Sequence, residues 1–305
     1  MKRPSFSIIV PTYQRRGLVC ETVRALSGIK YQGDVEVLVV VDGSTDGTAA
    51  ALKKLDCRFP LRVVEQPNRG AGAARNLGAR KSRGEILLFL DDDMICEPDI
   101  VDQHARSYRS GSGADAVIGD FTEPAAPSGF LSEVLAKRGD GTLTPFDMFS
   151  GQISMRREAF EAVGGFDESF AGNGDWGDFD VGLRLLRDFV VVHNPMAVSH
   201  HRGVLTPRAH VRRARTCAAA TVRFAAKHPE LRSQLIEWTG AARISRKVRL
   251  LCKVPVIPPL AANLTALIAE AALHTPLRSS ATLSYLRQVG YTLAYWSTME
   301  REGGL

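Results

Sequence analysis

Three polar clusters follow short apolar runs within the first hundred residues, and their residue types could bind a phosphorylated ligand. They are Pro11-Thr12-Tyr13, Asp42-Gly43-Ser44 and Asp91-Asp92-Asp93. In an open α/β sheet, ligands bind at the carboxyl ends of the strands, so each cluster stands where a ligand would be met. Three adjacent carboxylates repel one another, and oxygen ligands of this kind suit Mg²⁺ or Mn²⁺, which bridge carboxylates and a substrate diphosphate. The alternative, that the triplet caps the next helix, accounts for one aspartate but not for three.

The residues around these clusters predict a parallel sheet whose strands alternate with helices. Strands separated by helices of about a dozen residues form right-handed βαβ units, with both faces of the sheet covered. The expected strands are Phe6–Pro11, Val35–Val41, Leu61–Glu65 and Glu85–Leu90, and the expected helices are Gly17–Ser27, Ala49–Leu55 and Gly70–Lys81.

The second half of the sequence has a weaker alternation and ends in a helical region. We expect helices at Met155–Val163 and Asp178–Arg187, strand-like runs at Phe189–His193 and Ala197–His200, and helices from His210 almost to the end.

Four motifs, in order and each at an expected strand end or helix start, resemble those of the family 2 glycosyltransferases. They are Ile9–Tyr13, Val41–Thr48, Asn68–Asn76 and Phe89–Asp93. The resemblance covers about residues 5–205 and implies the GT-A fold, a Rossmann-like α/β architecture with a mainly parallel central sheet and flanking helices. It further implies an inverting enzyme that uses nucleotide-activated sugars.

The expected division of the chain follows from this resemblance and from the helical pattern after it. Residues 1–209 would form the GT-A domain, with a nucleotide-sugar half at 1–110 and an acceptor half at 111–209. Residues 210–305 would form a basic, mostly helical C-terminal region.

The resemblance implies a role for each donor-site residue. The turn at Pro11, Thr12 and Tyr13 would pack on the base and ribose, with Arg15 in the same loop, and Asp42 would accept a hydrogen bond from a base N–H. Gly72 would permit close approach of the donor, and Arg75 would reach the base or diphosphate; its alternative is an exposed ion pair on a helix. Asp91 and Asp93 match the family's Asp-x-Asp motif. Asp91 and Asp92 would reach the nucleotide sugar. Asp91 and Asp93 would bind the metal, with Asp93 as its main ligand.

The acceptor side carries a second group of implied roles. Family members have Glu-Asp where this chain has Gly177-Asp178, so Asp178 stands at the position of the general base. It is expected to begin a helix, whose dipole favours a carboxylate, although it could also be a simple cap. Asp175 and Asp180 are its alternatives as base.

Three further residues are expected near the acceptor, and one near the metal. Trp176, Gly151 and Asp175 would contact the acceptor, although Trp176 could equally be a core residue. His200 would bind the metal, because the strand alternation from Ala197 leaves only one of the histidines at 200 and 201 pointing into the site. The alternative for His200 is a core or surface histidine.

These roles imply a single displacement with Mn²⁺ or Mg²⁺ as cofactor and a UDP-sugar as the favoured donor. The metal and Arg75 would neutralise the departing nucleoside diphosphate, while Asp178 deprotonates an acceptor hydroxyl of a glycan, lipid-linked or small molecule. Two alternative hypotheses for the function remain open. The first is a sugar-nucleotide-binding or scaffold protein with a decayed site, and the second is a nucleotidyltransferase.

Composition and charge narrow the class of protein further. Among the 305 residues, 45% are hydrophobic and 24% charged, as in globular domains, and no apolar run is long enough for a polytopic membrane protein. The five cysteines, an odd number, form no CxxC pair, so reduced thiols in a cytoplasmic protein are expected.

Basic residues are concentrated at the C-terminal end of the sequence. Residues 1–200 carry 23 Lys and Arg against 28 Asp and Glu (net −5), whereas residues 201–305 carry 16 against 5 (net +11). The basic and apolar stretch at residues 243–273 could touch the inner face of a membrane, form a homo-oligomer contact or cover its own chain. No nucleic-acid motif accompanies the charge.

Overall fold

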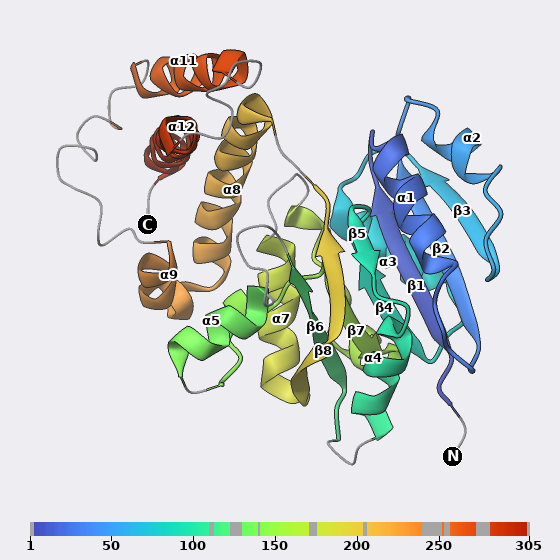
Figure 1. Ribbon diagram of the computed structural model, residues 1–305. Coiled ribbons are helices and arrows are strands. Elements are labelled where there is room, and N and C mark those ends of the chain that lie inside the picture. Colours follow the sequence, from blue (N-terminus) through green and yellow to red (C-terminus); the bar gives the residue numbers. More distant parts are fainter. Residues whose placement is uncertain are drawn as a thin grey trace. The chain divides into compact units, whose positions relative to one another are not determined.

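The computed structural model contains two compact units (Figure 1). The sheet unit comprises residues 1–171 and 177–203, and the helical unit comprises residues 172–176 and 204–305. The structure describes residues 3–109, 113–122, 130–139, 141–170, 176–203, 206–239, 252, 257–272 and 281–303.

An eight-stranded mixed sheet forms the centre of the sheet unit. Its strand order is β3-β2-β1-β4-β7-β6-β8-β5. The first four strands pair in parallel, β7 runs antiparallel to both β4 and β6, β8 is parallel to β6, and β5 pairs antiparallel with β8 at the edge. The strands are β1 (Phe6–Thr12), β2 (Val35–Asp42), β3 (Leu61–Gln66), β4 (Ile86–Leu90), β5 (Met94–Cys96), β6 (Ala116–Thr122), β7 (Gln152–Arg156) and β8 (Val191–His201).

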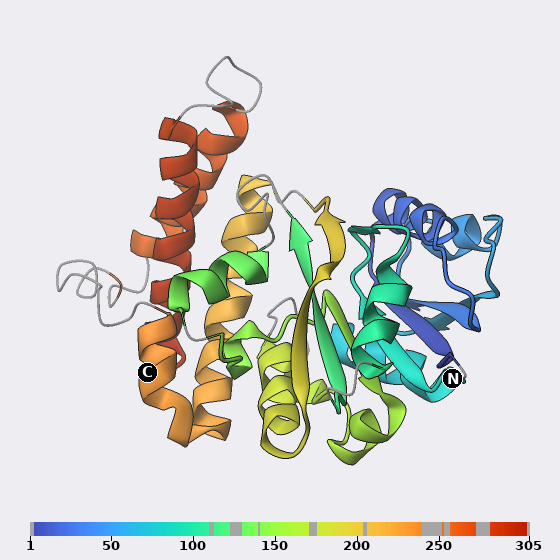
Figure 2. The same ribbon diagram turned by 60° about the horizontal axis from the view of Figure 1, so that its bottom comes forward.

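Helices cover both faces of this sheet, because apolar side chains of the central strands point alternately to either side (Figure 2). In β1, Ile8 and Val10 join the core under α1, α2 and α4, whereas Ile9 joins the core under α3, α5, α6 and α7. The helices are α1 (Arg16–Leu26), α2 (Thr48–Leu52), α3 (Ala71–Lys81), α4 (Ile100–Arg109), α5 (Phe130–Arg138), α6 (Arg157–Ala162) and α7 (Trp176–Asp188), with 3₁₀ turns at Pro145–Asp147 and Glu168–Phe170.

The α/β architecture expected from the sequence is confirmed, and each of the four predicted strands agrees with the structure to within one residue at either end. Two other local expectations were wrong. The helix expected from Met155 begins only at Arg157, because Met155 lies in β7 and pairs with both β4 and β6. The two strand-like runs after Phe189 are parts of one strand, β8.

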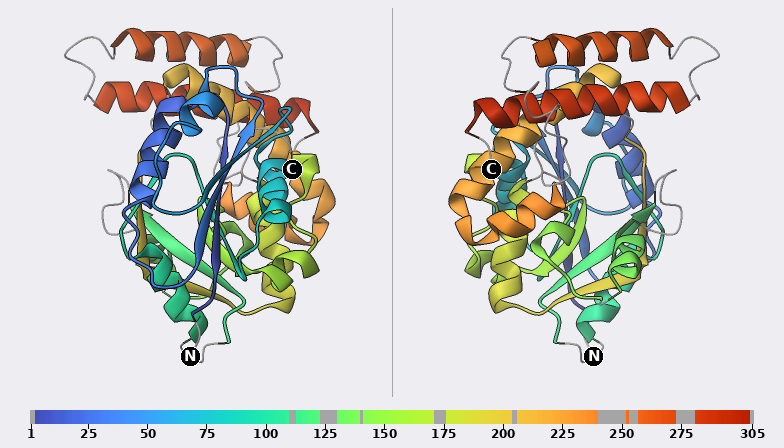
Figure 3. Two further views of the ribbon diagram at one scale, coloured as in Figure 1. Left: turned by 90° about the vertical axis from the view of Figure 1, so that its right-hand side faces the viewer. Right: turned by 90° about the vertical axis from the view of Figure 1, so that its left-hand side faces the viewer.

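Three helices pack pairwise in the helical unit (Figure 3). Alanines from each of them, including Ala214, Ala266 and Ala294, form the core together with Tyr295. In the described part of the chain, no helix has the length and apolar content to cross a membrane. The helices of this unit are α8 (Pro207–Lys227), α9 (Arg232–Trp238), α11 (Ile257–Ala272) and α12 (Ala281–Arg301), with a 3₁₀ turn at Pro229–Leu231.

Candidate active site

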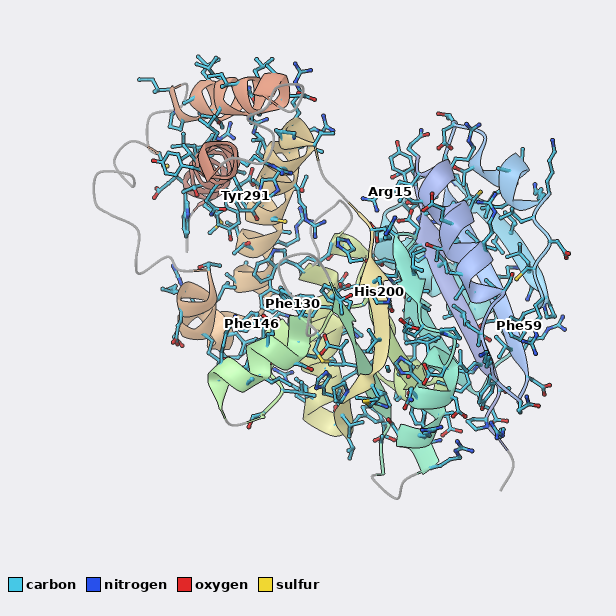
Figure 4. All side chains as sticks on the ribbon, in the orientation of Figure 1. Arg15, Phe59, Phe130, Phe146, His200 and Tyr291 are labelled. Atoms are coloured by element: carbon cyan, nitrogen blue, oxygen red, sulfur yellow. The ribbon has the colours of Figure 1, made fainter. Side chains whose placement is uncertain are left out.

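The three aspartates that follow β4 point in different directions. Asp91 is half-buried and lies 2.7 Å from Nη2 of Arg75, whereas Asp92 and Asp93 are buried and share the guanidinium of Arg15, at 2.9 and 2.8 Å. The cation that the triplet requires is therefore supplied in part by the protein itself. Arg15 lies in the loop after β1, at the carboxyl ends of the parallel strands (Figure 4).

The neighbouring aspartates 92 and 93 differ in their electrostatics. Burial raises the pKa of Asp92 to about 6, and the opposing effects of Arg15 and of a 2.7 Å hydrogen bond from Thr12 are weaker. Burial also acts to raise the pKa of Asp93, but the hydrogen bond with His201 and the charge of Arg15 outweigh it, so that this pKa lies below its usual value. Asp93 is thus the better anionic ligand.

The two histidines at the end of β8 face different partners. His200 lies 2.8 Å from Glu97 through Nε2 and 2.7 Å from the Thr122 hydroxyl through Nδ1. Nε2 of His201 lies 3.5 Å from Oδ2 of Asp93. The expectation that His200 points to the aspartates was therefore wrong, and His201 takes this place.

The pairing of β5 with β8 explains this orientation. His201 is opposite Met94, the residue directly after the triplet. Alternation shows which residues share a face of a strand, but not which face meets the aspartates. Beyond β8 the chain passes so close to Asp93 that a Cβ at Gly203 would overlap its carboxylate. Gly203 is a site residue that sequence reasoning did not single out.

Arg75 lies between the carboxylates of Asp91 and Asp178. It lies in α3, is buried, and places Nη1 3.6 Å from Oδ1 of Asp178 while Nη2 contacts Asp91. Its guanidinium also stacks over the Phe166 ring, 5.3 Å from the centroid. Oδ2 of Asp178 accepts a 3.1 Å hydrogen bond from the Ser150 backbone N–H. The ion pair considered as the alternative for Arg75 thus exists, but it is buried and joins two site residues.

Asp178 is the third residue of α7, within its first turn, rather than the residue that caps it. Among its alternatives, Asp180 is fully buried and bonded to Arg184 at 2.6 Å, as expected of an i,i+4 pair that stabilises a helix. Asp175 lies outside the described residues. Within the described part of the chain, the buried hydroxyl of Ser150 has no hydrogen-bond partner. Sequence reasoning gave Ser150 no role of its own.

Two other expected acceptor residues have different surroundings. The backbone oxygen of Gly151 accepts a 3.1 Å hydrogen bond from the Asp91 N–H, and a Cβ at this position would lie 3.1 Å from the Asp91 carboxylate. Trp176 is buried and packs on Phe224 of α8, with ring centroids 5.1 Å apart. This packing favours the core alternative for Trp176.

Asp42 holds the loop that precedes α3. Its carboxylate accepts hydrogen bonds from Nε2 of Gln66 at 2.7 Å and from the N–H groups of Arg69 and Gly70 at 2.8 Å each. Asp42 was expected to accept a hydrogen bond from a nucleotide base. In the structure its carboxylate accepts hydrogen bonds from the protein itself. Gly72, also expected at the donor, is the second residue of the helix that this loop begins.

The loops after β1 and β2 are joined by hydrogen bonds. Gln14 has φ +55° and donates from its backbone N–H to the Ser44 hydroxyl and from its side chain to Thr45, both at 2.9 Å. Pro11 lies in the buried strand β1, one residue before its end, whereas Tyr13 is 48% exposed. This connection fixes the loop that carries Arg15.

A divalent cation would find part of its coordination here. Among the described residues, no group of three or more His, Cys, Asp and Glu side chains is arranged to hold a metal ion. Asp93 and His201 nevertheless offer a carboxylate and an imidazole side by side. Mg²⁺ and similar ions are commonly held by one or two protein ligands, with substrate phosphates and water completing the shell, so the two side chains fit such an ion.

The family model described as glycosyl transferase family 2 matches residues 7–164, more than half of the chain. The chain belongs to this family. It is 29% identical over 272 residues to validoxylamine A glucosyltransferase from Streptomyces hygroscopicus subsp. jinggangensis, and equally to the enzyme of that name from subsp. limoneus. Each match takes in 76% of this chain but only 63% and 58% of the respective relatives.

Solved structures with the GT-A fold match nearly the whole of this family 2 chain. The mannosyltransferase PcManGT from Pyrobaculum calidifontis, in complex with GDP-Man and Mn²⁺, has a TM-score of 0.63 at 24% identity, covering 99% of this chain and 89% of that one. S. aureus TarS has a TM-score of 0.57 at 19% identity, covering 99% and 92%. These likenesses confirm the GT-A fold expected from the sequence motifs.

Proposed function

We propose that this protein transfers a sugar from a nucleoside-diphosphate sugar, preferably a UDP-sugar, to a hydroxyl acceptor with inversion at the anomeric carbon. The observation that carries the proposal is the placement of Arg75 between Asp91 and Asp178. One buried cation thereby links the carboxylate at the donor motif to the carboxylate at the position of the base.

Cationic side chains support the binding of a diphosphate at this edge of the sheet. Arg15 and Arg75 present guanidinium groups beside the aspartates, and guanidinium groups suit phosphate oxygens. Tyr13, exposed in the loop after β1, offers a ring for the base. Solved structures of similar fold are complexes with GDP-Man, with UDP or with UDP-GlcNAc, so the fold itself does not select one base. The preference for uracil is our proposal for this chain.

We assign the metal to Asp93 and His201, with Asp91 facing the donor. A bound Mn²⁺ or Mg²⁺ would offset negative charge on the leaving diphosphate. Arg15 contacts the same Asp93 oxygen as His201 does, and its side chain is partly exposed, so that it can turn toward the phosphates when the donor binds.

The chemical step then uses the chain's own carboxylate. Asp178 removes the proton of the acceptor hydroxyl, and that oxygen forms a bond to the anomeric carbon as the bond to the diphosphate breaks. The electron pair of the broken bond leaves with the nucleoside diphosphate, beside Arg75. The Ser150 N–H holds the base in place, and the Ser150 hydroxyl, buried beside it, is suited to a hydrogen bond with the acceptor.

The test is calorimetric titration of the full chain with UDP, GDP and dTDP, each with and without Mn²⁺. We expect UDP to bind with a micromolar dissociation constant, more tightly than GDP or dTDP, and this binding to depend on Mn²⁺. His201→Ala should weaken the effect of Mn²⁺, whereas His200→Ala, the matched control next to it, should not. Failure of all three nucleotides to bind the folded protein would favour the decayed-site alternative.

A further inference from the structure

The α11 helix has its large apolar residues on the outside and its small ones on the inside. Its inner side consists of alanines that pack against α8 and α12, among them Ala262 and Ala266. Along its outer side, large aliphatic side chains recur at intervals of three and four residues, which places them on one face of the helix. They are Ile257, Leu260, Leu264, Leu267 and Ile268, each between 47% and 61% exposed.

This exposed face is unusual within the molecule. Of the nine large hydrophobic side chains exposed in the described part of the chain, five lie on α11. The alanines bring the α11 backbone close to its two neighbouring helices, so the longer side chains cannot turn into the same core. A continuous apolar patch of this kind marks a surface that another body covers.

The sequence on both sides of α11 is basic. The one acidic residue of α11, Glu270, is paired at 2.6 Å with Arg208 of α8. The stretches of sequence on either side of α11 contain no Asp or Glu. Residues 240–256, of which only Cys252 is described, carry Arg243, Arg246, Lys247, Arg249 and Lys253, and residues 273–280, outside the described residues, carry Arg278.

These two observations select between the bodies that could cover α11. A second copy of the chain would bring together two regions of net charge +11, since residues 201–305 carry 16 basic and 5 acidic residues. A bilayer with anionic headgroups presents negative charge next to an apolar interior, which complements both the basic flanks and the aliphatic face.

We propose that the outer face of α11 docks on an anionic phospholipid membrane. The five aliphatic side chains enter the boundary between headgroups and acyl chains, with the helix lying parallel to the surface. The basic flanking residues strengthen binding by about fivefold each where they reach the headgroups. The docking is independent of the sugar donor and of the proposed transfer reaction.

The test is co-sedimentation of the full chain with vesicles of phosphatidylcholine containing phosphatidylglycerol, and with vesicles of phosphatidylcholine alone. We expect binding to the anionic vesicles that is at least about tenfold stronger and is weakened by salt. Leu264→Glu should lower the affinity by at least about tenfold, because it removes a leucine that would enter the membrane and adds a negative charge that the anionic lipid repels. Met196→Glu in β8, at a position that is more exposed than Leu264 but lies in the sheet unit, should bind as the wild type does.

Three results would overturn the proposal. The first is no binding to either type of vesicle, and the second is equal binding by wild type and Leu264→Glu. The third is a dimer, seen by light scattering without lipid, that Leu264→Glu dissociates, since a second copy would then be the partner. Thermal unfolding checks that Leu264→Glu is folded, and Leu260→Ser, at a still more exposed position, repeats the test with a neutral side chain.

Discussion

The two units of this protein distribute polarity in opposite ways. The sheet unit buries large aliphatic residues on both faces of its sheet. It also buries charges, such as Arg75 in α3 and Asp92 and Asp93 after β4. The core of the three packed helices in the helical unit is rich in alanine, and the large aliphatic residues of α11 lie outside it. Burial of apolar area is the main favourable term in folding, so the large core of the sheet unit can tolerate a charged site. In the helical unit, we propose that the exposed aliphatic residues of α11 serve for contact with a membrane.

The largest effect is expected from the charge that we assign to chemistry. Asp178→Asn should lower the transfer rate by about a thousandfold, because an amide cannot accept the proton of the acceptor. Nucleotide binding should be retained, since the amide oxygen can still accept the Ser150 N–H. Asp188→Asn, exposed at the end of the same helix, is the control and should leave the rate unchanged. Equal loss of binding and rate in Asp178→Asn would remove this residue from the role of base.

A second test compares a buried ion pair with an exposed one in the sheet unit. Arg75→Met should reduce the free energy of unfolding by about 3 kcal/mol, because it leaves carboxylates in a buried site without their cation. Arg69, which pairs with Glu168 at the surface, serves as the contrast, and Arg69→Met should cost less than about 1 kcal/mol. Urea unfolding measures both. If the two substitutions reduce the free energy of unfolding equally, the buried ion pairs of Arg75 contribute no more to stability than the exposed pair of Arg69.

The helical unit provides the reciprocal experiment on one helix. Ala266→Leu should reduce the free energy of unfolding by about 1–3 kcal/mol, since the added side chain has no room between α11 and its neighbours. Leu264→Ala, on the outer face, should change it by less than about 0.5 kcal/mol. The reverse order of these two effects in denaturant unfolding would mean that α11 packs with its large residues inward.

The last effect is absent at neutral pH and concerns a buried neutral histidine of the sheet unit. Burial lowers the pKa of His104 from 6.5 to about 3, with Nδ1 bonded to Ser154 at 2.8 Å. Between these pH values the unfolded chain binds a proton that the folded chain cannot, so acid favours unfolding, whereas above pH 6.5 the residue has no effect. Within this window, His104 should reduce the free energy of unfolding by about 1.4 kcal/mol for each unit by which the pH falls. His104→Gln should remove this slope, and an unchanged slope in urea unfolding would show that His104 is not its source.

Some strands of this fold can be predicted from the local sequence, whereas others depend on pairing with segments far away in the sequence. The strands β1, β2 and β4 are mostly apolar runs, because the sheet is covered on both faces, and such runs are easily recognised in the sequence. The three-residue β5 and the strand β7 lack such a pattern and were missed, since β7 exists because β4 and β6 offer it hydrogen bonds on either side.

The site shows the same limit. Motifs placed Asp91, Asp93 and Asp178 at strand and helix ends, but they gave no information on which partner each carboxylate takes. The ion pair of Arg75 with both Asp91 and Asp178, and the choice of His201 over His200, arise from contacts between segments far apart in the sequence.

The pairing of β5 with β8 also has a consequence for the order of events during synthesis. Cys96 is opposite Ser199, 103 residues further along the chain. Domains fold as the chain emerges, and contacts between distant segments form late. The nascent protein can assemble β1 to β4 early, with the aspartates already displayed at their edge. His201 reaches Asp93 only after β8 has been synthesised, so a product that ends before β8 would carry the aspartates without the histidine that lies beside them.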